Sequence, residues 1–429
     1  MQLRPGYKQT EVGMLPEEWA VVPFSALLEF RNGVNADKHA YGKGIPFINV
    51  LEVITKAHLQ AADIPGRVSL SKNTVDSFAV RRGDLVFNRT SETQEEVGLS
   101  SVYLDDVPVV FGGFVIRGRP TCDAVDPVYS GYAFRAPAVR AQIIARGQGA
   151  IRANVGQSDL RQVLAPLPPL PEQRAIAGAL GDVDALLGAL TQLIAKKRDL
   201  KQAAMQQLLT GQTRLPGFSG NWEVRRLGDL FSFSGGLSAS REQLSDSGLC
   251  YLHYGDIHKS TKSFINVNAE FIDIPKLDVP LSEVSASARL QDGDVVFVDA
   301  SEDDEGTSRH LVIVNPGQIP YISGLHTIVA KSRSGALDNG YKRYCFQSQN
   351  VKEQFRFYAA GTKVSGISKT SIAKIVLMYP PSVPEQTAIA AVLSDMDAEI
   401  AAVEQRLAKT HALKQGMMQE LLTGRTRLV

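Results

Sequence analysis

Apolar residues recur at alternating steps of three and four along two long stretches of the chain, Pro171–Leu215 and Pro384–Leu428. Such steps average about 3.5 residues and keep the apolar side chains on one helical face, so each stretch is predicted to form one long helix with a coiled-coil seam. The predicted seam is Ile176, Leu180, Val183, Leu187, Leu190, Ile194, Leu200 and Leu208 in the first helix, and Ile389, Leu393, Met396, Ile400, Val403, Leu407, Leu413 and Leu421 in the second. A helix with this seam needs a partner, and the other long helix is the nearest candidate. The alternative is that each helix packs only on its own domain.

The same residue types mark the start and the end of both predicted helices. Each stretch opens on a Pro-Glu pair, in which proline lacks only a hydrogen bond that the first turn cannot make. Glu172 and Glu385 add negative charge at the positive end of the helix dipole. Gly211 and Gly424 stand near the far ends, where a left-handed residue commonly terminates a helix. We therefore expect roughly 40 residues of unbroken helix in each copy, about 60 Å long.

The two stretches are copies of one another. The second follows the first at a constant spacing of 213 residues without a gap, and more than half of the aligned positions are identical. The segments that precede them repeat too: Val80–Glu92 resembles Leu290–Glu302, each a Gly-Asp turn leading into a β-rich run. The chain is therefore an internal duplication in the order globular domain, long helix, globular domain, long helix.

The expected fold class is α+β, with two mixed domains separated by the two long helices. A chain of 429 residues is too long for one core, which agrees with this division. Aromatic residues at helical spacing are expected to mark the core of each domain: Tyr129, Tyr132 and Phe134 recur as Tyr341, Tyr344 and Phe346. The predicted boundaries are 1–165 for the first globular domain, 166–214 for the central helix, 215–379 for the second globular domain and 380–429 for the C-terminal helix.

Composition places the chain among ordinary globular proteins of a reducing compartment. The three cysteines are few, odd in number and far apart, which argues against a disulfide framework or a zinc site. The first residues lack the apolar core of a signal peptide, and no run of about 18 apolar residues is present, so a cytoplasmic protein without a membrane span is expected. The net charge of +1 means that any nucleic-acid surface would have to come from local segregation of charge.

The chain has no established enzyme motif: it lacks GxGxxG, the Walker loop, HExxH, GxSxG and CxxC. Asp126-Pro127-Val128-Tyr129 resembles the Asp-Pro-Pro-Tyr motif of adenine methyltransferases, but Val128 breaks it and the second copy lacks it, so a structural role is expected. The pairs Asp182/Asp184 and Asp395/Asp397 recur in both helices. Because residues two apart on a helix point to nearly opposite sides, we expect surface or partner contacts from them.

Polar loops remain as candidates for contact with nucleic acid. Arginine and amide side chains can read base edges, whereas lysine and hydroxyl groups hold phosphates. The alternative for each residue is an ordinary solvated loop position. The candidates are Arg89, Arg152 and Asn154 in the first domain, and Arg241, Lys363, Ser365 and Lys369 in the second.

At this point the chain resembles a known family, the specificity subunits (S, HsdS) of type I restriction–modification systems. The similarity lies in PLPEQRAIAGAL and PSVPEQTAIAAVL at the starts of the long helices, in LLTGQTRL and LLTGRTRL at their ends, in GYKQTEVGMLPEEW near the N-terminus, and in the half-repeat itself. It covers nearly the whole chain.

The resemblance implies two target recognition domains, each of which reads one half of a split, asymmetric site on double-stranded DNA. It also implies that the long helices pair antiparallel as a coiled coil and hold these domains apart. Two modification subunits, which would carry S-adenosylmethionine, and the restriction subunits would dock on this frame, and the chain itself would hold no cofactor or metal and have no catalytic role. The competing interpretation is a coiled-coil adaptor that does not bind DNA and displays two protein-binding domains.

Overall fold

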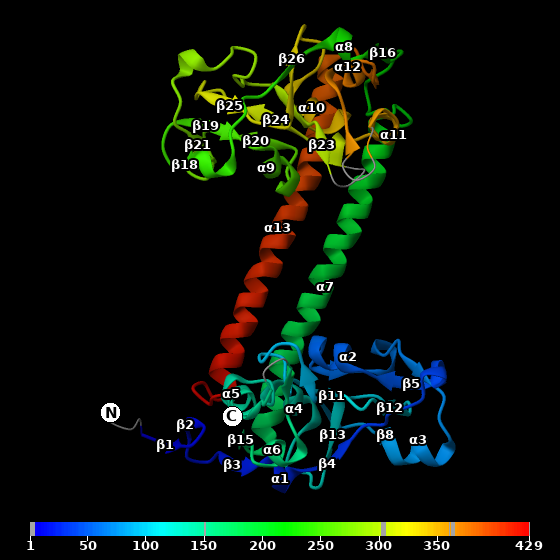
Figure 1. Ribbon diagram of the computed structural model, residues 1–429, viewed down its shortest axis with the longest axis vertical. Helices are drawn as coiled ribbons and strands as arrows, with labels where there is room; N and C mark the ends of the chain where they lie inside the picture. Colours follow the sequence, from blue (N-terminus) through cyan, green and yellow to red (C-terminus); the bar gives the residue numbers. More distant parts are fainter. Residues whose placement is uncertain (1–4, 150–151, 302–305, 360, 362–364, 429) are drawn as a thin grey trace. The chain divides into compact units, whose positions relative to one another are not determined.

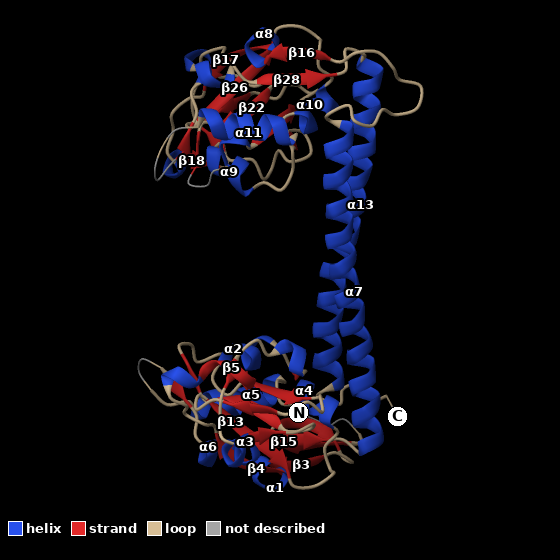
Figure 2. Cartoon of the chain, turned by 90° about the vertical axis from the view of Figure 1, so that its right-hand side faces the viewer, coloured by secondary structure: helices blue, strands red, loops and turns tan. Residues whose placement is uncertain are grey.

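The computed structural model describes residues 5–149, 152–301, 306–359, 361 and 365–428. They form two compact units. Unit 1 comprises Met1–Thr191 and Gln405–Val429, and unit 2 comprises Gln192–Glu404. The two predicted helices are unbroken: α7 spans Leu170–Leu208 and α13 spans Val383–Leu421, 39 residues each. Each unit therefore contains one part of α7 and one part of α13, which run side by side within it (Figures 1 and 2).

Two sheets and six short helices build the globular part of unit 1. The five-stranded sheet has the order β4 (Leu28–Asn32), β13 (Val115–Pro120), β9 (Leu85–Asn88), β11 (Ser100–Tyr103) and β6 (His58–Leu59). The four-stranded sheet has the order β7 (Arg67–Val68), β5 (Tyr41–Ile48), β12 (Val109–Phe111) and β8 (Ala79–Val80). Short pairs join β1 (Tyr7–Thr10) to β2 (Gly13–Pro16), β3 (Ala20–Pro23) to β15 (Leu164–Leu167), and β10 (Thr90–Ser91) to β14 (Ala153–Asn154). The helices are α1 (Phe24–Leu27), α2 (Val50–Thr55), α3 (Lys72–Phe78), α4 (Pro127–Ala133), α5 (Pro137–Arg146) and α6 (Gln157–Arg161).

Unit 2 repeats the order of the five-stranded sheet and differs in its four-stranded sheet. Its five-stranded sheet has the order β17 (Phe231–Gly235), β26 (Thr327–Ser332), β22 (Val295–Val298), β24 (His310–Val314) and β20 (Phe264–Asn266). Its four-stranded sheet has the order β18 (Leu244–Ser245), β21 (Lys276–Leu277), β19 (Leu249–Leu252) and β25 (Tyr321–Ser323). Short pairs join β16 (Glu223–Arg226) to β28 (Val376–Tyr379) and β23 (Ala300–Ser301) to β27 (Ser365–Gly366). The helices are α8 (Leu227–Leu230), α9 (Tyr254–Lys259), α10 (Asn339–Cys345), α11 (Gln349–Tyr358) and α12 (Lys369–Ile372). The predicted mixture of helix and sheet, and the internal repeat, are confirmed.

The largest hydrophobic cluster of each unit combines a globular domain with the start of one long helix and the end of the other. In unit 1, Ile176 and Leu180 of α7 pack in the same cluster as Leu421 of α13. In unit 2, Leu208 of α7 packs in the same cluster as Leu393 of α13. The aromatic residues predicted as core are buried in both units, with exposed fractions of 3% or less. The unfolding of either unit therefore involves both long helices.

The helix ends confirm the predicted terminal glycines. Gly211 and Gly424 have φ angles of +69° and +67°, a conformation that side chains other than glycine rarely adopt. A Cβ atom on Gly424 would also lie 2.5 Å from the ring of Pro16, so the end of α13 approaches the N-terminal hairpin closely. The same hairpin holds the tail through Tyr7, whose hydroxyl donates to the Gly424 carbonyl at 2.8 Å.

Two predicted seam positions are wrong. Leu200 and Leu413 are 54% and 58% exposed, whereas the other fourteen predicted positions are buried or half-buried. Steps of three and four that alternate strictly from Ile194 place the next seam positions at 197 and 201. Lys201 therefore faces the seam, although the neighbouring Leu200 is the more apolar residue. Lys414 is the corresponding position of α13. Both lysines lie on the seam with side chains 20% and 23% exposed.

The exposure of Leu200 and the burial of Leu208 predict different effects of alanine substitution on stability. Leu200→Ala should change the free energy of unfolding by no more than about 0.5 kcal/mol, because more than half of the residue surface is already in solvent. Leu208→Ala, at a position 6% exposed, should cost about 2–4 kcal/mol. Urea denaturation of both variants checks the contrast, and equal losses would contradict the corrected register.

Candidate nucleic-acid interface

A buried glutamate at the start of each long helix binds an arginine from the tail of the other. In unit 1, the side chain of Glu172 is fully buried and accepts two hydrogen bonds from Arg427, from Nε at 2.5 Å and from Nη2 at 2.9 Å. Trp19 Nε1 donates to the same carboxylate at 2.9 Å. In unit 2, Arg214 donates to Glu385 in the same two-point manner, at 2.5 Å and 2.6 Å. The repeated Pro-Glu and Thr-Arg-Leu motifs are therefore two halves of one contact.

The glutamine that follows each glutamate fastens the helix start to its domain. Gln173 Nε2 donates to the carbonyls of Pro168 and Ala124, each at 2.9 Å, and its Oε1 accepts from the backbone N–H of Asp126 at 2.8 Å. Gln386 makes the corresponding three bonds in unit 2, at 2.7–2.8 Å. Both amides are buried, and three satisfied hydrogen bonds fix the direction in which each helix leaves its domain.

A tyrosine, an aspartate and the seam lysine form a second contact in each unit. In unit 1, the Tyr132 hydroxyl donates to Asp184 at 2.7 Å, and Lys414 Nζ donates to the other carboxylate oxygen at 2.6 Å. The ammonium group also lies 5.4 Å from the centroid of the Tyr132 ring. Burial and the bond to Asp184 raise the pKa of the Tyr132 hydroxyl well above its usual value near 10, so it remains a donor at neutral pH.

Unit 2 repeats this arrangement with Tyr344, Asp397 and Lys201, at 2.9 Å and 2.5 Å. Along α7 the contacts run from Glu172 to Asp184 in unit 1, while their partners run back from Arg427 to Lys414, so α7 and α13 are antiparallel there. The Asp397–Lys201 and Glu385–Arg214 contacts show the same order in unit 2. Two further ion pairs of unit 2, Lys197–Glu399 and Arg198–Glu404, have the same antiparallel order. The second aspartate of each repeated pair thus makes a contact between structural elements, as expected.

The three polar residues predicted in unit 1 lie together. Thr90 Oγ1 donates to Asn154 Oδ1 at 2.6 Å across the β10–β14 pair, and Val155 N donates to the carbonyl of Arg89 at 3.0 Å. Asn154 Nδ2 donates to the carbonyl of Arg152 at 2.9 Å. One small edge of the domain therefore presents two guanidinium groups and an amide.

The residues predicted in unit 2 belong to different places. Arg241 lies just before β18 and binds Asp256 at 2.9 Å, with the His253 ring 3.3 Å away. Ser365 lies on β27, opposite Ser301 on β23. Lys369 is the first residue of α12. Lys363 lies outside the described residues.

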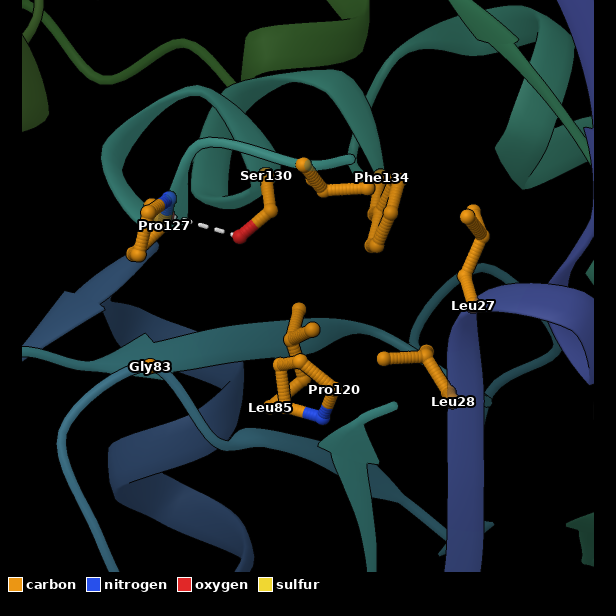
Figure 3. Close-up of a pocket in the computed structure, with 9 residues that line it drawn as sticks. Leu27, Leu28, Gly83, Leu85, Pro120, Pro127, Ser130 and Phe134 are labelled. Carbon is orange, nitrogen blue, oxygen red and sulfur yellow. Dashed lines mark hydrogen bonds between the residues drawn. The ribbon is translucent and has the colours of Figure 1, made fainter. Parts of the chain in front are cut away.

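Asp126 has the structural role expected for it. Its carboxylate caps α4 by accepting from the backbone N–H groups of Val128 and Tyr129, each at 3.0 Å. A small apolar pocket beside this helix, shown in Figure 3, is lined by Leu27, Leu85 and Phe134 among other residues. Its volume of about 10 Å³ is at the lower limit for one water molecule. Among the described residues, no group of three or more His, Cys, Asp or Glu side chains could hold a metal ion.

One helix of the described chain, α7, is long and apolar enough by length and composition to cross a membrane, with a mean hydropathy of 1.2 over its most apolar window. Its seam residues Leu180 and Leu208 instead pack in the cores of units 1 and 2. The geometry thus defines a class of protein, a duplicated chain with two mixed domains and two long helices. In each unit, equivalent Glu–Arg and Tyr–Asp–Lys contacts connect the domain and the helices.

Comparison with known proteins finds similarity to one family. A family model described as "Type I restriction modification DNA specificity domain" matches residues 219–410. The putative type I restriction enzyme MjaX specificity subunit of Methanocaldococcus jannaschii is 24% identical, over 98% of this chain and 97% of the relative. The type I restriction enzyme StySPI specificity subunit of Salmonella potsdam is 23% identical, over 96% of this chain and 90% of the relative.

Solved structures share the fold over almost the full length. The S subunit of the type I restriction–modification system from M. genitalium aligns with a TM-score of 0.54 and 15% identity, covering 98% of each chain. A chain from a structure on complex assembly and conformational transition of the type I system aligns with a TM-score of 0.57 and 16% identity, covering 96% of this chain and 99% of that one. The chain is thus similar over nearly its whole length to specificity subunits of type I restriction–modification systems, the family that the sequence resembles.

Proposed function

We propose that this chain selects the DNA site of a type I restriction–modification complex. Each unit reads one half of a bipartite, asymmetric site on double-stranded DNA, through target recognition domains at 1–165 and 215–379. The long helices, 166–214 and 380–429, carry two modification subunits and the restriction subunits. S-adenosylmethionine belongs to the modification subunits in this proposal, and the complex works in the cytoplasm.

One observation carries the proposal. The two units keep the same buried contacts at their helices but differ in the chemistry of their exposed loops. The contacts of Glu172 with Arg427 and of Glu385 with Arg214 are equivalent, as are those of the two Tyr–Asp–Lys groups, whereas the edge that presents Arg89 has an aspartate in unit 2. A common frame with two different surfaces suits a protein that must recognise two unlike half-sites. An adaptor that binds proteins would not explain the similarity to DNA specificity subunits.

Exchange of one domain tests this function. Residues 20–160 are replaced by the equivalent residues of another family member, and the chain is assembled with its modification subunits. Mapping of methylated adenines should show a new sequence in one half-site, with the other half-site unchanged, because each unit has its own core. A change in both half-sites would contradict independent recognition. A complex that methylates no bipartite site would reject the proposed function.

A further inference from the structure

Each unit contains one turn at which three chain segments meet, and the backbone contacts of this turn are the same in both units. Turn 1, Gly112–Phe114, joins β12 to β13, and turn 2, Gly324–His326, joins β25 to β26. At turn 1, Arg89 N donates to the Phe114 carbonyl at 2.8 Å, and Val34 forms a bridge to Gly112.

The corresponding contacts of turn 2 involve residues from the equivalent segments. Asp299 N donates to the His326 carbonyl at 3.2 Å, Leu237 forms a bridge to Gly324, and Ile367 N donates to the Asp299 carbonyl at 2.8 Å. The last bond matches the one from Val155 N to the Arg89 carbonyl in unit 1. The repeat therefore preserves the position of these turns.

The base of each turn is tightly packed. A Cβ atom on Gly112 would lie 2.8 Å from the ring of Phe47, and one on Gly324 would lie 2.5 Å from the carbonyl oxygen of Leu252. Neither position has room for a side chain, so each turn is held firmly against its sheet. A firmly held turn is what sequence recognition requires, because the position of a side chain must be defined before it can discriminate between bases.

The tips of the two turns differ in chemistry. At turn 1, Phe114 is 61% exposed, and Arg89 Nη1 lies 3.5 Å from the carbonyl oxygen of the neighbouring Gly113. Asn154 lies on the adjoining β10–β14 pair, and Arg152 comes directly before β14. This tip combines an exposed aromatic ring with cationic groups and an amide.

At turn 2, His326 stands where turn 1 has Phe114, and Asp299 stands where turn 1 has Arg89. His326 Nδ1 lies 3.2 Å from Asp299 Oδ1, and the imidazole packs edge-on against Tyr254 with centroids 5.5 Å apart. The His326 side chain is still 49% exposed. Its φ of +58° is strained for a residue with a side chain, and among the described non-glycine residues only Gln318 shares a positive φ. Strain of this kind is concentrated at functional sites.

We infer that turns 1 and 2 are the base-contacting tips of the two recognition domains and that the residue pairs Arg89/Phe114 and Asp299/His326 select the bases. The inference rests on the proposed function. Arginine pairs with the acceptors of guanine, and an exposed apolar ring suits the thymine methyl group. Aspartate accepts from the amino group of cytosine. Turn 1 is therefore matched to guanine and thymine, and turn 2 to cytosine, which gives the two half-sites different sequences.

The test uses the full chain assembled with its modification subunits. One variant combines Arg89→Ala with Phe114→Ala, and the other combines Asp299→Ala with His326→Gly, because glycine accepts the positive φ of position 326. Each variant should weaken binding to the parental site roughly 10- to 100-fold and make bases of one half-site degenerate in a map of methylated sites. The two variants should affect opposite half-sites and leave the spacer unchanged.

Matched controls remove equally exposed side chains elsewhere in the same units. Leu51→Ala in unit 1 and Ile272→Ala in unit 2, at positions 66% and 89% exposed, should keep the parental site and an affinity within about twofold. Phe114→Ala alone, at an exposed position, serves if the double variant of turn 1 fails to fold. Turn variants that retain every base of the parental site would overturn the inference while leaving the proposed function intact. A parental complex that methylates no bipartite site would instead overturn the proposed function.

Discussion

Arg427→Met is expected to lower the free energy of unfolding of unit 1 by about 3–5 kcal/mol, because it leaves the carboxylate of Glu172 buried without its cation. The hydrogen bonds to Glu172 and Glu18 raise the pKa of Arg427, so the guanidinium stays charged at any pH at which the protein is studied. The side chain of Glu172 has no exposed surface and cannot recover water in the folded state. The substitution lies two residues from the end of the chain, yet it should release the end of α13 from the core of unit 1.

Each unit contains one tryptophan, which allows the effect to be followed separately. In a Trp222→Phe background, the fluorescence of Trp19 reports the urea unfolding of unit 1. Arg214→Met is the matched substitution in unit 2 and should leave this transition unchanged. The double variant Glu172→Gln/Arg427→Met should be more stable than Arg427→Met alone, because a neutral amide costs less to bury than an unpaired carboxylate. A loss below about 1 kcal/mol for Arg427→Met would show that the pair behaves as a surface ion pair.

This contact also shows what the sequence could and could not predict. The motifs of Glu172 and Arg427 were visible as repeated helix ends, and the helix dipole accounted for a glutamate at the first turn. The pairing was not visible, because both copies carry the same motifs: Glu172 could have paired with Arg214 as well as with Arg427. An internal repeat makes long-range partners ambiguous, and only the antiparallel packing of the helices decides between them.

The seam shows a second limit of the same kind. Periodicity located both long helices and most of their buried positions. It failed at Leu200, where hydrophobicity and helical register disagree by one residue. Lys201 and not Leu200 faces the seam, because an α-helix cannot rotate locally without breaking its hydrogen bonds. The long stem of Lys201 fills the seam, and its ammonium group reaches Asp397.

The surface residues show the third limit. The sequence offers Arg89 and Asn154 as candidates, because polar loop residues are considered as a class. It does not offer Phe114 or His326, since an exposed aromatic residue in a strand-rich segment cannot be distinguished by sequence from a core residue. Alignment of the two copies after the fold is known places both residues on equivalent turns, and their difference then becomes informative.

The pH dependence of unit 2 is expected to be dominated, between pH 6.5 and 4, by one buried histidine. Burial lowers the pKa of His310 to about 4, and the nearby cation Lys352 acts in the same direction. The imidazole packs against the rings of Phe297 and Phe346, with centroids 5.5 Å and 5.1 Å away. An imidazolium in this apolar site would lack the solvation that it has in the unfolded chain.

The sign of the effect follows from proton uptake. Above pH 6.5 neither state binds the proton, and the contribution of His310 to stability is complete. As the pH falls from about 6.5 to about 4, the unfolded chain is protonated and the folded chain is not, so stability is lost at up to about 1.4 kcal/mol per pH unit. Below about pH 4 the folded state also binds the proton and the loss ends.

His310→Ser isolates this contribution, because the matching position of unit 1 is the buried Ser100. The variant should be less stable than the parent at pH 7, since it leaves a cavity, but its stability should fall less steeply between pH 6.5 and 4. Urea unfolding at several pH values, followed by Trp222 in a Trp19→Phe background for both chains, measures the two slopes. The difference should approach about 3 kcal/mol at pH 4. Parallel slopes would mean that His310 already binds its proton within the folded unit, and that the packing of Phe297 and Phe346 does not exclude the imidazolium.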